Sequence, residues 1–207
     1  AMFFGPPGTG KTLTATLLGK YTGKEVFKID LSMVISKFVG ETEKNLANLF
    51  NKAENKNWIL FFDEADALFS KRTNVRGGHA KYANQSAGYL LQRIEGFNGL
   101  VILATNFRNN IDDAFIRRFH SIIHFPIPNE KERLELWKKA FPKKVKTNGI
   151  DLQFIAKKYV LSGSAIMNVM QYSCLQALAL DTNKISQKML LDGIRKEFNK
   201  EGQIWDG

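Results

Sequence analysis

The segment Gly5–Thr12 constrains the fold of this chain more than any other, and it reads Gly-Pro-Pro-Gly-Thr-Gly-Lys-Thr. An apolar run at Met2–Phe4 comes directly before it, and a helix-forming stretch at 13–21 comes directly after it. Glycines in such a loop let backbone N–H groups turn toward a phosphate, and the following helix adds the partial positive charge of its N-terminus. A glycine-rich turn with a merely solvated lysine is the alternative, but the strand–loop–helix context favours a phosphate-binding loop.

The loop predicts which atoms would hold the phosphates. Lys11 would reach the β and γ phosphates of a nucleoside triphosphate, and the hydroxyl of Thr12 would hold Mg²⁺. The candidate binding residues of this segment are Gly5, Pro6, Pro7, Gly8, Thr9, Gly10, Lys11, Thr12 and Leu13.

Apolar runs alternate with helix-forming stretches up to residue 125, a pattern typical of a parallel sheet flanked by helices. The expected strands are Met2–Phe4, Val26–Ile29, Trp58–Phe62, Leu100–Ala104 and Ile122–Phe125. The expected helices between them cover 11–21, 41–55 and 80–94. A basic, glycine-containing segment at 70–82 is expected to be a loop.

The pattern changes after Phe125, where Pro126 and Pro128 end the last strand and Asn129 can cap a helix. Helical periodicity follows at 130–141, 151–159, 163–181 and 186–199. We therefore expect an α/β domain of the P-loop NTPase type at 1–127, with three layers and a parallel five-stranded sheet. A small all-α lid domain is expected at 128–207.

Two acidic residues, Asp63 and Glu64, follow the third expected strand. At the end of a buried strand beside a phosphate-binding loop, Asp63 would organise Mg²⁺ and Glu64 would act as the general base that polarises the attacking water. An acidic helix cap after a strand is the alternative interpretation, and the loop upstream argues against it.

Asn106 ends the fourth expected strand, where its amide could hydrogen-bond the γ-phosphate and the attacking water. An asparagine in an ordinary turn is the alternative. Arg117 and Arg118 precede the last strand, and they could be surface cations or arginine fingers offered to the nucleotide of a neighbouring subunit. A finger of this kind supplies about 10³–10⁵ in rate, so an isolated subunit would be a slow ATPase.

Composition excludes some classes of protein and leaves others open. No apolar run approaches membrane-spanning length, and the first residues lack the features of a secretory signal. The single cysteine, Cys174, rules out an internal disulfide and fits a reducing compartment, so we expect a cytoplasmic protein. The net charge of +10 could reflect nucleic acid, an acidic protein partner or only a soluble surface.

Taken together, these motifs resemble the AAA family of P-loop ATPases over nearly the whole chain. The order of the glycine loop, Asp63-Glu64, Asn106 and Arg117-Arg118 matches the family, in which Asn106 takes the place of the first sensor. The segment Glu95–Phe97 resembles the family's intersubunit signalling segment. The resemblance implies ATP as the nucleotide, with Mg²⁺, bound between the subunits of a ring that is commonly hexameric.

The segment 36–46 closely resembles the first pore loop, and the helix after it, of members that thread polypeptides. Within it Lys37, Phe38 and Val39 would contact the substrate, because an exposed aromatic gives sequence-tolerant contact area. Core residues at a strand end are the alternative for Phe38 and Val39. The resemblance thus implies ATP hydrolysis in a ring coupled to remodelling, unfolding or disassembly of a protein substrate. A nucleic-acid motor or loader, suggested by the net charge, and a nucleotide-switched assembly scaffold are the alternatives.

The sequence departs from the family pattern in three places. It begins inside the first expected strand, so we expect a fragment that lacks the linker upstream of that strand. Gly163 and Ser164 resemble the small-domain segment that approaches the adenine, but Ala165 stands where many members have an acidic residue. Arg117 and Arg118 are adjacent, which leaves open which of them reaches the phosphate. The compact arginine pair is similar to that of the microtubule-severing branch, and a further likeness is to bacterial AAA proteins associated with phage-tail-like injection particles.

Overall fold

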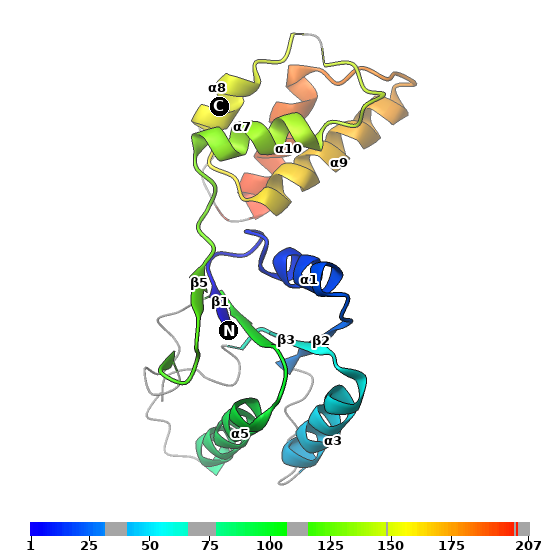
Figure 1. Cartoon of the computed structure of the whole chain (residues 1–207). Helices are drawn as coiled ribbons and strands as arrows, with labels where there is room; N and C mark the ends of the chain where they lie inside the picture. The colour runs from blue at the N-terminus through cyan, green and yellow to red at the C-terminus, as the bar shows by residue number, and fades with distance from the viewer. Residues whose placement is uncertain (32–40, 66–77, 107–115, 148, 201, 203–207) are drawn as a thin grey trace. The chain divides into compact units, whose positions relative to one another are not determined.

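The computed structural model describes residues 1–31, 41–65, 78–106, 116–147, 149–200 and 202 (Figure 1). Contacts between residues divide the chain into two compact units. The first unit holds residues 1–6 and 10–125, and the second holds residues 7–9 and 126–207. Each unit has its own hydrophobic core.

The first unit is built on a parallel sheet of five strands in the order β2-β3-β4-β1-β5. The strands are β1 (Met2–Phe4), β2 (Val26–Asp30), β3 (Ile59–Asp63), β4 (Val101–Thr105) and β5 (Ile122–His124). β1 pairs with β4 in the register Phe4↔Thr105. Because the two strands are parallel, the loop that leaves β1 begins beside the residue that follows β4.

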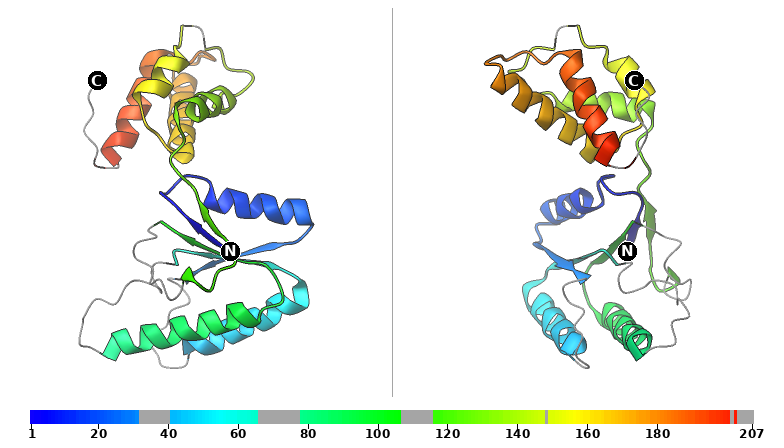
Figure 2. Two further views of the ribbon diagram at one scale, coloured as in Figure 1. Left: turned by 60° about the vertical axis from the view of Figure 1, so that its left-hand side comes forward. Right: turned by 180° about the vertical axis from the view of Figure 1, so that it is seen from behind.

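Helices cover both faces of this sheet (Figures 1 and 2). α1 (Lys11–Thr22) lies on one face, and α3 (Glu41–Lys56) and α5 (Gly78–Gly96) lie on the other. Alternate residues of each central strand enter one core or the other: Phe61 belongs to the α1 side, and Phe62 packs with Phe50 of α3 on the opposite side. Burial on both faces explains why β3 and β4 are apolar almost throughout.

The second unit contains the helices α7 (Glu130–Ala140), α8 (Leu152–Lys158), α9 (Gly163–Ala179) and α10 (Gln187–Lys200). Asn129 caps α7 as expected, because its side chain accepts from the Glu132 N–H and the Glu132 side chain accepts from the Asn129 N–H. Arg133 is buried on α7 and donates from Nε to the carbonyl oxygen of Ala156 in α8 at 2.9 Å. Trp137 is the largest side chain in the core that these helices share.

The predicted α/β class, with five parallel strands followed by helices, is confirmed. The loop expected at 70–82 is wrong in its last residues, because 78–82 belong to α5. Glycine at Gly78 is compatible with a helix start, where the first N–H groups have no intrahelical partner in any case. The roles of 1–127 as an ATP-binding domain and of 128–207 as a lid stay predictions.

Within the described residues, every helix is too short or too polar to cross a bilayer.

Candidate functional site

The glycine loop leaves β1 and enters α1 through backbone conformations that suit glycine. Gly5 is buried with φ +148°, and a Cβ at this position would collide with the backbone carbonyl oxygen of Phe125. Gly10 has φ +102° and is the N-cap of α1, with no side-chain hydrogen bond to the first turn. The start of α1 therefore lacks a side-chain cap, and uncapped N–H groups at a helix N-terminus are suited to bind phosphate.

Lys11 begins α1, and its ammonium group connects the parts of the site. The residue is only 7% exposed. Its Nζ donates to the carbonyl oxygen of Gly5 at 2.7 Å, to that of Pro6 at 3.0 Å and to Oδ1 of Asn106 at 3.0 Å. An ammonium has three N–H donors, and these three oxygens of the protein provide one acceptor for each of them. The structure thus brings Lys11 and Asn106, two residues predicted separately, into direct contact.

Asp63 and Glu64 lie at the carboxyl end of β3. The Asp63 side chain is 23% exposed, and its Oδ1 accepts from the N–H of Glu64 at 3.1 Å. Glu64 is exposed and has a left-handed backbone, with φ +54°. The next residue, Ala65, returns to the sheet through an N–H bond to the Ala104 carbonyl at 3.0 Å. A left-handed conformation costs a residue with a Cβ about 1–2 kcal/mol, and strain of this kind clusters at functional sites.

A lysine that the sequence patterns did not single out contacts Asp63. The Nζ of Lys28 lies 2.9 Å from Oδ2 of Asp63. Lys28 is opposite Phe61 in the pairing of β2 with β3, so it reaches diagonally along one face of the sheet to the residue two positions further on. Lys28 also lines a cavity of about 290 Å³, together with Thr12, Thr16 and other residues of α1 and β2.

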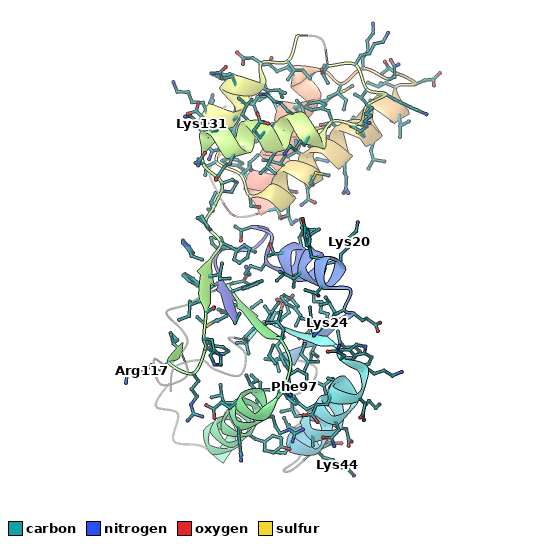
Figure 3. All side chains as sticks on the ribbon, viewed as in Figure 1. Lys20, Lys24, Lys44, Phe97, Arg117 and Lys131 are labelled. Carbon is teal, nitrogen blue, oxygen red and sulfur yellow. The ribbon has the colours of Figure 1, made fainter. Side chains whose placement is uncertain are left out.

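Arg117 and Arg118 lie in different surroundings. Arg118 donates from an Nη atom to Oε1 of Glu95 at 3.0 Å, which joins it to the C-terminal end of α5. Arg117 is exposed and, within the described residues, forms no ion pair. Figure 3 shows Arg117 on the side of the first unit away from β2. Phe97, the last residue of the predicted signalling segment, lies in the core and meets Phe50 edge to face.

The remaining predicted residues divide into those that the structure describes and those that it does not. Leu13 is 63% exposed on α1, and Thr12 beside it is exposed as well. Gly163 and Ser164 form the first turn of α9, which Ser162 caps by accepting from the Ala165 N–H at 3.3 Å. The predicted pore-loop residues Lys37, Phe38 and Val39 lie outside the described residues.

The oxygen ligands available in the site suit a magnesium ion. In the described part of the chain, no three His, Cys, Asp or Glu side chains gather as a metal-binding group. Thr12 and Asp63 offer one hydroxyl and one carboxylate. This sparse set fits Mg²⁺, which keeps several waters and takes its other ligands from phosphate.

The parallel sheet with helices on both faces, the glycine loop and the buried lysine together define a P-loop nucleotide-binding protein. The sequence profile of the family described as "ATPase family associated with various cellular activities (AAA)" matches residues 1–127. The chain therefore belongs to the AAA family.

Curated relatives extend the similarity beyond the matched region. The chain is 33% identical to the 26S proteasome regulatory subunit 8 homolog of Encephalitozoon cuniculi, over 98% of this chain and 54% of that protein. It is 31% identical to the proteasome-activating nucleotidase of Thermococcus onnurineus, over 98% of this chain and 53% of that protein. It is 33% identical to cell division protein C of Sulfolobus acidocaldarius, over 75% of this chain and 44% of that protein.

The chain thus spans about half the length of the curated relatives it matches. Their names refer to proteasomal and cell-division proteins. The likeness to AAA proteins of phage-tail-like injection particles gains no support from them.

Two ion pairs of the site, Lys28–Asp63 and Arg118–Glu95, could not be read from motifs. Each joins residues from elements that are separate in the sequence, so it depends on strand register or on helix placement. The only sequence signal for the first pair is period-2 alternation, which puts Lys28 on the same face of β2 as Val26 and Asp30.

Gly5 and Gly10, two of the three glycines in the loop, give a testable difference in stability. We expect Gly10→Ala to cost about 1–2 kcal/mol, because the space around it is open and only backbone strain opposes the change. Gly5→Ala should cost more, since the Phe125 backbone must also move. Urea unfolding followed by circular dichroism measures both. Equal losses for the two variants would contradict the described packing of Gly5.

Proposed function

We propose that this protein hydrolyses ATP in an oligomeric ring and couples hydrolysis to remodelling or unfolding of a protein substrate. The ring would be the hexamer that the family resemblance implies. The observation that carries the proposal is the contact of Lys11 with both the glycine loop and Asn106. This contact joins Lys11, which would hold the phosphates, to Asn106, which would sense the γ-phosphate. Membership of an ATPase family supports the same activity.

Nucleotide binding would exchange the partners of Lys11. The ammonium now bonds neutral carbonyl and amide oxygens. Phosphate oxygens are charged acceptors, and charge-assisted hydrogen bonds are roughly twice as strong as neutral ones. Any acceptor that Lys11 releases becomes available, so Asn106 would be freed to bond the γ-phosphate or the attacking water. The presence or absence of the γ-phosphate would thereby change the hydrogen bonds of Asn106, the residue after β4.

Asp63 and Thr12 would hold Mg²⁺, and the ion would neutralise charge on the β and γ phosphates when bound. Glu64 would act as the general base toward water. Its exposed carboxylate and left-handed backbone at the end of β3 support this role. Gly163 and Ser164 would approach the adenine, as the family resemblance implies.

The two arginines would serve one active site from a neighbouring protomer. We assign contact with the neighbour's phosphate to Arg117, which is exposed and without an ion pair in the described part of the chain. Arg118 would be oriented by Glu95, which links it to α5. This division explains why two adjacent arginines need not act alike.

A protein substrate is supported by the resemblance of segment 36–46 to a polypeptide-threading pore loop. Lys37, Phe38 and Val39 would then contact the threaded chain. Two relatives named for activating or regulating the proteasome match nearly all of this chain, which supports the same class of substrate. A cytoplasmic location agrees with the single cysteine.

The general base is tested by Glu64→Gln. We expect ATP affinity to stay near the wild-type value because the phosphate-binding groups remain, while turnover falls by at least about 10²-fold. Fluorescent-nucleotide binding and phosphate release measure the two quantities. Glu54→Gln, an equal charge change on the exposed side of α3, is the control and should leave both unchanged. Normal turnover in Glu64→Gln would remove Glu64 from its role.

The substrate class is tested by stimulation of the ATPase. Unfolded polypeptide should raise turnover, and DNA should not, at low and at moderate salt. Stimulation by DNA alone that weakens steeply with salt, as counterion release requires, would instead indicate a nucleic-acid motor.

A further inference from the structure

We infer that Lys28 is a built-in counterion of the metal-holding carboxylate and sets how strongly nucleotide binding depends on Mg²⁺. This inference rests on the proposed function, in which Asp63 and Thr12 hold the ion. It assigns a role to a residue outside the loop and outside the motifs at the strand ends.

The geometry places the lysine on the carboxylate itself. Nζ of Lys28 lies 2.9 Å from Oδ2 of Asp63, while the other oxygen, Oδ1, accepts from the Glu64 N–H. Both carboxylate oxygens therefore have a partner before any metal binds. A cation that approaches Asp63 must share Oδ2 with the ammonium or displace it.

The exposure of the pair makes such displacement feasible. The Lys28 side chain is 55% exposed, and that of Asp63 is 23% exposed. Ion pairs this accessible to water are weak, so Mg²⁺ can compete with the ammonium. Because Lys28 and Thr12 line one cavity, the displaced ammonium would stay close to the proposed metal ligands.

Two opposite effects follow from the charge. Without metal, Lys28 neutralises Asp63 and lets a triphosphate bind beside a carboxylate that would otherwise repel it. With metal, the same positive charge opposes Mg²⁺ and competes for Oδ2. Lys28 thus favours metal-free nucleotide and disfavours the ion.

The chain offers a matched control for charge. Lys24 lines the same cavity and carries the same charge, but within the described residues it forms no ion pair. Figure 3 labels Lys24, which lies between α1 and β2 in the chain. Lys24→Met therefore removes one positive charge from the cavity without freeing Asp63.

The experiment is equilibrium binding of a fluorescent ATP analogue, first in EDTA and then titrated with MgCl₂. In Lys28→Met we expect affinity in EDTA to fall by roughly two- to five-fold, the range that exposed ion pairs support. The Mg²⁺ concentration for half-maximal binding should fall by a similar factor. Lys28→Arg should keep both values near wild type. Lys24→Met should not lower both the affinity in EDTA and the Mg²⁺ concentration for half-maximal binding.

The outcomes separate the inference from the function on which it rests. In one case the wild-type protein binds the nucleotide, while Lys28→Met leaves its affinity unaltered or weakens it equally with and without Mg²⁺. Either result would overturn the role of Lys28 alone. Absence of nucleotide binding in the folded wild-type protein, with or without Mg²⁺, would overturn the proposed function as well. Thermal unfolding of each variant confirms that the fold is retained.

Discussion

The hydrogen bonds of the Lys11 ammonium are the interaction on which the site depends. They bring the loop after β1, the first turn of α1 and the residue after β4 to one point. Parallel pairing of β1 with β4 makes this possible, because both strands deliver their ends to the same edge of the sheet. A buried ammonium needs acceptors, and the backbone carbonyls of Gly5 and Pro6 and the side chain of Asn106 supply them.

Two of the predicted site residues already have a partner of opposite charge within the first unit. Asp63 is paired with Lys28, and Arg118 is paired with Glu95. Both pairs are partly exposed, so each contributes little to stability and can be exchanged for a stronger partner. In the proposed function, such pairs would orient Asp63 and Arg118 without fixing them permanently. A site that binds and releases a highly charged nucleotide in each cycle, as proposed here, would need this property.

Much of this architecture could be predicted from periodicity and local motifs. Uninterrupted apolar runs located β3 and β4, and Asn129 marked the start of α7 correctly. The helix expected at 80–94 is present as α5, but it begins at Gly78, inside the segment 70–82 whose glycines indicated a loop. The partners of Lys28 and Arg118 and the left-handed backbone of Glu64 depend on tertiary geometry, which a motif does not encode. The assigned roles of these residues stay predictions.

In the proposed mechanism each active site is shared, with Glu64 from one protomer and Arg117 from the next. Mixing Glu64→Gln protein with Arg117→Ala protein tests it directly, because each lacks a different half of the site. In randomly mixed rings, head-to-tail interfaces predict about a quarter of wild-type ATPase activity from two nearly inactive parents. A mixture that forms mixed rings yet is no more active than its parents would contradict the account.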